Sequence, residues 1–186
     1  DFCLSRGLGD VYKRQILIGA STGGPEALSY LLKLLPQPCP PIIVVQHISS
    51  LFAKSFAQRL AQVSALKLGS CDDSSALKHS HIYIAADDYH LKINHANGIF
   101  CIKKDLHDPV HGHRPSVDVL FESVVGLDGA FLNIILTGMG KDGALGLQKI
   151  KQSGKKYGFI IGQDEDSCVV YGLSLIHISE PTRQAE

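Results

Sequence analysis

Apolar residues along the middle of the chain follow two alternating patterns. Short apolar runs are typical of strands buried in a sheet, and they predict strands at 16–19, 42–45, 81–85, 133–136 and 158–161. Apolar residues spaced three and four positions apart are typical of helices with one buried face, and they predict helices at 25–35, 52–63, 116–125 and 143–152. Pro25 in a first turn and Ser116 as an N-cap support two of these helix starts.

The segment at 90–103 departs from this alternation. Two short strand-like runs, 90–94 and 99–103, flank Ala96-Asn97-Gly98. An Asn-Gly pair between such runs is a strong signal for a β-hairpin. Strands that alternate with helices form a parallel sheet with helices on both faces, connected by right-handed crossovers. We therefore predict a doubly wound α/β fold with a mainly parallel sheet and a small antiparallel hairpin at one edge.

Composition and charge narrow the function classes. The chain has 186 residues, a length that suits one domain with a full core. It has 18 Lys and Arg against 18 Asp and Glu, and this balance gives no electrostatic reason to expect nucleic acid or an anionic membrane as a partner. No apolar run reaches the roughly 20 residues of a membrane-spanning helix, so we expect no membrane insertion. The five cysteines are scattered and include no Cys-x-x-Cys pair. They predict neither a disulfide framework nor a zinc site, and they favour a cytoplasmic location.

The two ends of the chain are related through their coding DNA. Codons for residues 5–15 (SRGLGDVYKRQ) can be written so that their reverse complement encodes residues 173–183 (LSLIHISEPTR), residue for residue. Such an inverted repeat is typical of a sequencing adapter added by a transposase, and segments of this kind are excluded from reasoning about the fold. We therefore predict an adapter-derived segment at 1–15, one domain at 16–172 that is incomplete at its C-terminus, and a second adapter-derived segment at 173–186.

Three of the predicted strands are followed by residues with reactive or ionisable side chains, a serine, a histidine and an aspartate. They lie at the edge where doubly wound sheets bind their ligands. The first strand runs into Gly19-Ala20-Ser21-Thr22-Gly23, which fits the G-x-S-x-G pattern of a nucleophile elbow. The helix that follows offers backbone N–H groups to an oxyanion. The alternative is a glycine-rich loop that holds a phosphate, although the segment lacks the Gly-Lys-Ser/Thr of a P-loop.

His47 follows the second strand, and Asp142 lies in a glycine-rich loop after the predicted strand at 133–136. His47 is either a general base for Ser21 or a structural histidine, and the neighbouring Gln46 either orients it or lines the pocket. Asp142 is interpreted as the carboxylate that orients the imidazole, as an N-cap of the next helix, or as both, because the two roles are compatible. The chain order Ser, His, Asp differs from the Ser, Asp, His order of α/β-hydrolases, which excludes that fold but not the mechanism.

The segment between the hairpin and the helix at 116–125 is polar. His107, His111 and His113 lie in it without a companion cysteine, so we interpret it as a substrate-facing loop and predict no metal site. Arg114 comes shortly before the start of the helix. It either holds an acidic group of a substrate or belongs to a helix cap together with Asp118.

Five motifs, taken in order, closely resemble the catalytic domain of CheB-type protein-glutamate methylesterases. They are IGASTGGPEAL at 18–28, VVQHI at 44–48, HRPSVDVLF at 113–121, ILTGMGKDGALGL at 135–147 and QDEDSCVVYG at 163–172. The resemblance covers 16–172. It implies a doubly wound α/β domain that hydrolyses glutamate γ-methyl esters on the cytoplasmic helices of chemoreceptors, releases methanol and can also deamidate receptor glutamines.

The resemblance also implies roles for individual residues. Ser21 corresponds to the nucleophile, His47 to the base and Asp142 to the acid, and Thr22 and Met139 fall where the backbone contacts the oxyanion. We predict no cofactor. The implied partner is the methylated cytoplasmic domain of chemoreceptors, in a chemotaxis phosphorelay where relatives often carry an upstream receiver domain.

Two other functions stay open at the level of sequence. A nucleotide- or phosphate-binding module would use the loop at 21–24. A non-catalytic scaffold would follow if the domain were truncated, because the family pattern continues after residue 172 with Met-Pro, a helix and a last strand, where this chain has 173–186.

Overall fold

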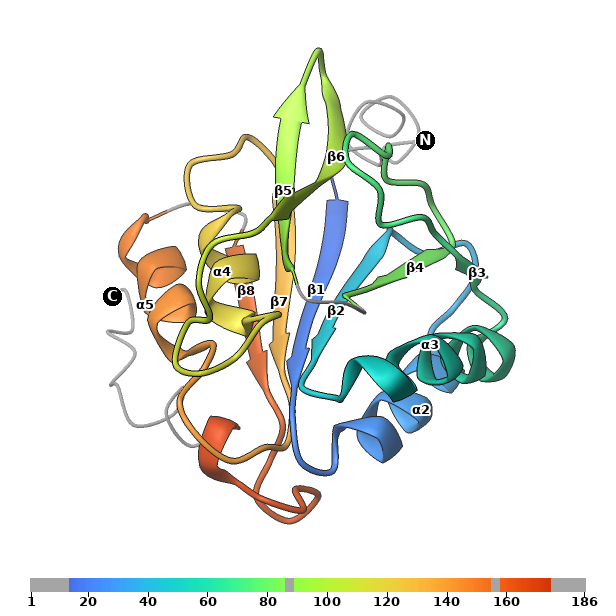
Figure 1. Cartoon of the computed structure of the whole chain (residues 1–186), viewed down its shortest axis with the longest axis vertical. Coiled ribbons are helices and arrows are strands. Elements are labelled where there is room, and N and C mark those ends of the chain that lie inside the picture. The colour runs from blue at the N-terminus through green and yellow to red at the C-terminus, as the bar shows by residue number, and fades with distance from the viewer. Residues whose placement is uncertain (1–13, 86–88, 155–157, 175–186) are drawn as a thin grey trace, which may run out of the picture.

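The computed structural model describes residues 14–85, 89–154 and 158–174 (Figure 1). At its centre is a parallel sheet with the strand order β3-β4-β2-β1-β7-β8. These strands are β1 (Arg14–Ala20), β2 (Ile42–Gln46), β3 (Lys67–Leu68), β4 (His81–Ile84), β7 (Ala130–Ile135) and β8 (Gly158–Gly162). The helices around the sheet are α2 (Gly24–Leu34), α3 (Ser50–Ser64), α4 (Val117–Glu122) and α5 (Ala144–Gln152).

Helices cover both faces of the sheet, as the fold class predicts. On one face, Leu28 and Leu32 of α2 and Leu60 of α3 are buried against side chains of the central strands, such as Ile18 and Val44. On the other face, α4 and α5 form a second apolar cluster with β1 and β7. Burying one such leucine or isoleucine contributes about 1.5–3 kcal/mol, so the two clusters together hold the layers in place. The predicted α/β class is confirmed.

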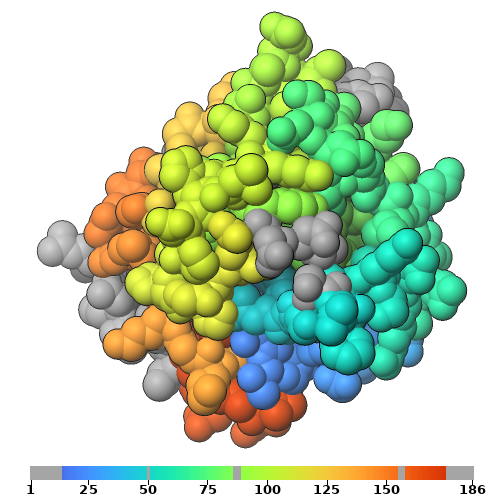
Figure 2. All heavy atoms as spheres, viewed as in Figure 1, coloured from blue at the N-terminus to red at the C-terminus, as the bar shows by residue number. Residues whose placement is uncertain are grey.

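The predicted hairpin is present but sits elsewhere. Strands β5 (His90–Ala96) and β6 (Ile99–Asp105) are antiparallel, and Asn97 and Gly98 between them have φ values of 53° and 78°, as a tight Asn-Gly turn requires. The prediction that the hairpin extends an edge of the main sheet needs correction, because β5 and β6 form a two-stranded sheet of their own. The apolar side of the hairpin is buried face-on in the cluster around α4, where Phe100 meets Phe131 edge to face at 5.7 Å. In this view the hairpin lies at the top of the molecule and the loop after it at the centre left of the front (Figures 1 and 2).

Element boundaries differ from the predictions in ways that have physical reasons. Strand β3 has only two residues, both exposed, and therefore leaves no apolar pattern in the sequence. Helix α4 ends at Glu122 rather than at 125, since residues 123–126 form turns that lead to Gly126 at a φ of 93°. Strand β1 begins at Arg14, two residues before the predicted start of the domain, because the backbone ladder to β7 continues there regardless of side chain.

The order of the strands brings three loops together. The chain leaves β1 toward β2 on one side and returns to β7 on the other side of β1, so the carboxyl ends of β2, β1 and β7 are neighbours at the lower end of the sheet in Figure 1. Ligands of doubly wound sheets bind at such a reversal. None of the helices that the structure describes has the length and apolar character needed to cross a membrane.

Candidate active site

Ser21 lies on the turn between β1 and α2. Its backbone N–H donates to the Thr137 carbonyl at 3.1 Å, and its own carbonyl accepts from Gly24 N at 2.9 Å, which closes the turn. Gly23 has a φ of 82°, a left-handed conformation that glycine adopts without a steric penalty. The chain can therefore turn sharply after Ser21 and hold its hydroxyl above the sheet edge.

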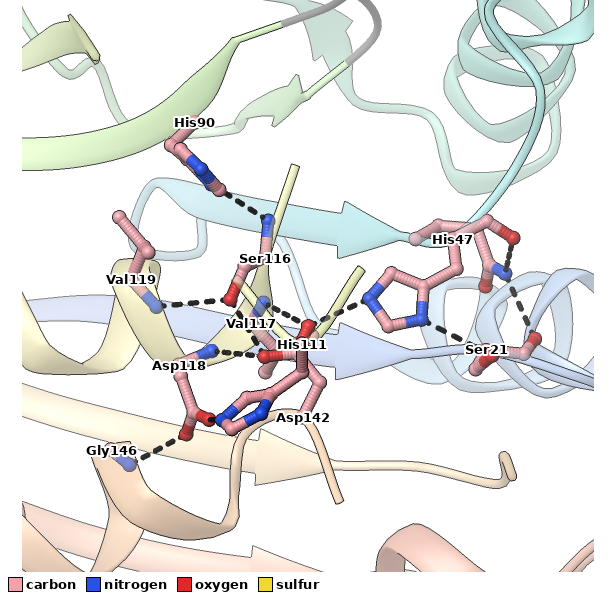
Figure 3. Close-up of polar contacts among 11 residues, drawn as sticks. Ser21, His47, His90, His111, Ser116, Val117, Asp118, Val119, Asp142 and Gly146 are labelled. Atoms are coloured by element: carbon pink, nitrogen blue, oxygen red, sulfur yellow. Dashed lines mark hydrogen bonds and ion pairs between the residues drawn. The ribbon is translucent and has the colours of Figure 1, made fainter. Parts of the chain in front are cut away.

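His47 joins Ser21 to Asp142 (Figure 3). Its Nδ1 lies 3.3 Å from Ser21 Oγ, and its Nε2 lies 2.8 Å from Asp142 Oδ2. A carboxylate only accepts hydrogen bonds, so Nε2 carries the proton and the lone pair of Nδ1 faces the serine hydroxyl. The structure thus brings together the serine, histidine and aspartate that the sequence placed after the ends of three separate strands.

Gln46, the last residue of β2, is almost fully buried beneath these two residues. Its side-chain amide donates to the backbone carbonyl of Ser21 at 2.8 Å and to that of His47 at 3.0 Å. One amide group therefore ties the backbone of Ser21 to that of His47. Of the two interpretations offered by the sequence, this geometry matches an orienting role.

Asp142 is buried and accepts four hydrogen bonds. Besides His47, the donors are the Ser116 hydroxyl at 2.7 Å and the backbone N–H groups of Val117 at 2.8 Å and Asp118 at 3.0 Å. Burial alone would raise the pKa of Asp142, but the bonds from His47, Ser116 and the two N–H groups outweigh it and lower the pKa. The carboxylate is therefore held in its charged form beside His47.

The alternative interpretation of Asp142 as an N-cap of the following helix is wrong. The N-cap of α5 is Gly143, and it makes no side-chain cap bond. Asp142 instead satisfies the first N–H groups of α4, on the other side of the loop. The predicted N-cap Ser116 is confirmed for α4, since its Oγ accepts from Val119 N at 3.4 Å.

Asp118 is a second buried carboxylate behind Asp142. Its Oδ1 accepts from Gly146 N at 2.7 Å, and its Oδ2 lies 3.5 Å from Nε2 of His111 (Figure 3). Burial and the negative charge of Asp142 raise the pKa of Asp118. Its bond to Gly146 fastens the start of α5 to α4 and so supports the loop that carries Asp142.

The loop histidines have separate neighbours. His107 pairs with Asp105, His111 lies near Asp118, and His113 stacks on the ring of His47 with centroids 3.8 Å apart and planes inclined by 6°. Within the described ranges, no group of three or more His, Cys, Asp or Glu side chains could hold a metal ion.

Thr22 and Met139 lie on two turns that touch each other. Thr22 follows Ser21 directly, and Met139 follows Gly138 on the turn after β7. A Cβ atom added to Gly138 would lie 2.6 Å from Ser21 Cβ, so only glycine permits this approach. The geometry brings the turn that carries Met139 against the serine, where backbone N–H groups could meet an oxyanion.

Arg114 lies on the rim of a cavity of about 290 Å³ beside His47. The cavity is lined by His47, Ile48, Ser49, Gly112, His113, Arg114 and Pro115. The Arg114 Nη1 donates to the backbone carbonyls of Leu106 at 3.4 Å and His107 at 3.2 Å. The N-cap of α4 is Ser116 and not Arg114, and Arg114 borders the space next to the histidine.

The sequence did not predict the residues that support the contacts among Ser21, His47 and Asp142. His90 is buried and accepts from Ser116 N through Nδ1 at 3.1 Å, while its Nε2 contacts the Asp108 carbonyl at 3.1 Å. The cap at Ser116 was a usable signal, because a helix that starts near the same sheet edge offers N–H groups to a carboxylate. The positions of His90 and Asp118 left no such signal.

Comparisons with known proteins agree on one family. The model of the CheB methylesterase family matches residues 16–181. Two relatives named protein-glutamate methylesterase/protein-glutamine glutaminase are similar to the chain: one from Chromohalobacter salexigens is 41% identical over 162 residues, and one from Vibrio vulnificus is 46% identical over 160 residues. The matches cover 87% and 85% of this chain but only 45% and 46% of those relatives, so the chain spans about half their length.

A solved structure is similar as well. The crystal structure of the Thermotoga maritima CheB methylesterase catalytic domain matches with a TM-score of 0.80 and 37% sequence identity. The match covers 88% of this chain and 86% of that one.

Proposed function

The chain belongs to the CheB methylesterase family, and we propose that it is a protein-glutamate methylesterase in which Ser21 is the nucleophile, His47 the general base and Asp142 the orienting carboxylate. The observation that carries this proposal is the continuous contact from Ser21 Oγ through the His47 ring to Asp142. Such a chain of contacts is what activates a serine for acyl transfer.

The reaction follows from these contacts. Ser21 Oγ adds to the carbonyl carbon of a glutamate γ-methyl ester while His47 Nδ1 accepts the serine proton. The C–OCH₃ bond then breaks, His47 returns the proton to the departing oxygen, and methanol leaves an acyl ester on Ser21. Water, deprotonated by His47, attacks this ester, and the glutamate carboxylate and the serine hydroxyl are released. A glutamine side chain would lose ammonia by the same steps.

Asp142 contributes through its charge. Since four hydrogen bonds hold its pKa low, it stays ionised while His47 takes up the serine proton. The ionised carboxylate fixes the proton on Nε2 and stabilises the imidazolium. The backbone N–H groups near Thr22 and Met139 would stabilise the oxyanion, which is typically the largest electrostatic term in such reactions.

We further propose that the substrate is the methylated cytoplasmic domain of a chemoreceptor and that the enzyme acts in the cytoplasm. Arg114 is the candidate for holding an acidic group of this substrate, because it borders the cavity next to His47. A planar guanidinium can bind a carboxylate through two parallel N–H···O bonds. A receiver domain, present in many relatives of this kind, would be a second partner.

The nucleophile assignment is tested by covalent labelling. We expect a fluorophosphonate reagent to modify Ser21 in the 186-residue chain and to leave the exposed Ser55 unmodified, as identified by peptide mass spectrometry. His47→Ala should abolish the labelling, whereas Ser55→Ala should not alter it. A phosphate-binding module or a non-catalytic scaffold would show no His47-dependent labelling of Ser21, and that result would overturn the proposal.

A further inference from the structure

The His113 ring lies flat on the ring of the candidate base. The two centroids are 3.8 Å apart, and the planes are almost parallel, at 6°. His113 is held by a tight turn in which the N–H groups of Val110 and His113 each donate to the carbonyl of the other residue, at 3.0 and 2.9 Å. His111 and Gly112 form the corner of this turn with φ values of 51° and 79°. The position of the His113 ring is therefore set by a hydrogen-bonded turn of the backbone.

This contact constrains a motion that the hydrogen bonds of His47 leave open. The bonds to Ser21 and Asp142 both lie at the rim of the imidazole ring, on Nδ1 and Nε2. They fix the two nitrogens but resist a tilt of the ring plane only weakly, because hydrogen bonds tolerate deviations of tens of degrees. A flat neighbour at van der Waals distance opposes that tilt directly on the face that it covers.

The charge of the neighbour matters as much as its shape. Burial and the adjacent His47 lower the pKa of His113, while the charge of Asp142 acts in the opposite direction and that of His111 in the same one. Arg114, next in the chain, lines the same cavity. His113 is thus a neutral ring when His47 takes up a proton. A cation on the face of a neutral aromatic ring is attracted, whereas two stacked cations repel each other.

We propose that His113 is a positioning residue for His47: its uncharged ring holds the plane of the base and stabilises the imidazolium that forms when Ser21 is deprotonated. This inference rests on the proposed role of His47 as the base of an esterase. His113 itself takes part in no proton transfer, so its ring can be replaced by another neutral ring.

Three substitutions separate shape, neutrality and proton transfer. His113→Phe keeps a neutral ring and should retain kcat within about threefold, while His113→Ala removes the stack and should lower kcat about tenfold with KM nearly unchanged. His113→Arg keeps a flat group but adds a permanent charge. It should lower kcat on the order of thirtyfold and move the acid limb of the kcat/KM profile to lower pH, because the nearby charge makes His47 harder to protonate.

The matched control is His95→Ala in β5. His95 also stacks on an aromatic ring, that of Phe100 at 4.4 Å, but it lies in the hairpin and should leave kcat unchanged. Thermal melting of every variant identifies any that fail to fold. The rate of Ser21 labelling by the fluorophosphonate gives a readout independent of the ester, so loss of ester hydrolysis with retained His113-dependent labelling would contradict the proposed function and not this inference.

Several results would overturn the inference. A His113→Phe variant as poor as His113→Ala would mean that a ring nitrogen of His113 is needed. A rise in KM without a fall in kcat would make His113 a substrate contact. Equal kcat values in His113→Arg and His113→Phe would show that the charge of the stacked group does not affect catalysis. A wild-type kcat in His113→Ala would show that the stacked ring does not affect it either.

Discussion

Asp142 and Asp118 are neighbouring buried carboxyl groups whose pKa values move in opposite directions. Asp142 accepts four hydrogen bonds, so its pKa is lowered despite burial. Its ionisation thus stabilises the folded chain above the unfolded-state pKa of about 4, and this contribution is lost as pH falls through the lowered value. Asp118 has fewer donors and faces the charge of Asp142, so its pKa is raised. Its ionisation destabilises the folded chain as pH rises through the raised value.

The pH dependence of Asp118→Asn tests this assignment. Asparagine removes a charge that is unfavourable in the folded state, so wild type should gain stability relative to the variant as pH is lowered from neutrality through the raised pKa. Urea unfolding at a series of pH values from 7.5 down to 4 measures the difference between the two free energies of unfolding. The control is Asp108→Asn at an exposed position, which should show no such trend. A gap between wild type and Asp118→Asn that stayed constant with pH would contradict the raised pKa.

Arg114 gives a prediction about recognition rather than chemistry. Lysine carries the same charge but cannot form the two parallel bonds of a guanidinium. Arg114→Lys should therefore raise KM for a methylated receptor several-fold, about 3–10 times, and leave kcat nearly unchanged, as expected for a loss of uniform binding. Steady-state kinetics separate the two constants. A collapse of kcat alone would instead place Arg114 in the support of the loop around His113.

Among the elements, the turn of the β5–β6 hairpin is expected to affect the stability of the fold but not the rate of catalysis. Gly98 has a φ of 78°, and a Cβ there would meet no atom within 4 Å. Gly98→Ala should thus cost about 1 kcal/mol through backbone strain alone, and chemical denaturation measures it. Because the turn lies at the end of the molecule opposite the site (Figure 1), kcat should not change. A fall in kcat would mean that the hairpin transmits its strain to α4.

The sequence predicted elements more reliably than their packing. Apolar runs located β1, β2 and β7, and the glycine-rich segments after them located Ser21 and Asp142, because both signals are local. The predicted placement of the hairpin was wrong. A strand with alternating apolar residues can pair with the edge of the main sheet or can form a separate sheet that packs on the core, and the local pattern is the same in both cases. For Gln46 the sequence left two roles open, because the Ser21 carbonyl that its amide binds lies 25 positions away in the chain. The supporting role of Asp118 depends on Gly146, 28 positions away, and a local pattern does not show which distant residues meet.

At the scale of the whole molecule, the flanking segments are the main untested prediction. We propose that 1–15 and 173–186 derive from adapter DNA; residues 1–13 and 175–186 of these segments lie outside the described residues. Arg14 and Gln15 extend β1, and Leu173 is buried against the Gly138 turn, where its N–H donates to the Gly138 carbonyl at 3.0 Å. Arg14, Gln15 and Leu173 are thus described residues of the predicted flanks that contact the domain.

Trimming tests this proposal. A chain of residues 14–174 keeps these contacts and should melt within about 2 °C of the 186-residue chain, a shift that corresponds to about 0.5–1 kcal/mol for a protein of this size. Calorimetry or circular dichroism measures both melting temperatures. A cooperative transition that fell by 10 °C or more on trimming would show that the flanks contribute packing that adapter-derived residues were never selected to provide.

The most direct measurement for the central proposal is methanol release from a methylated chemoreceptor by wild type and by Ser21→Ala. With Ser21 as the nucleophile, the variant should lose on the order of 10³-fold or more in kcat, as enzymes of this mechanism do when the nucleophile is removed. Ser55→Ala, an exposed serine on α3, should retain the wild-type rate. Methanol release by Ser21→Ala at close to the wild-type rate would contradict the proposed mechanism.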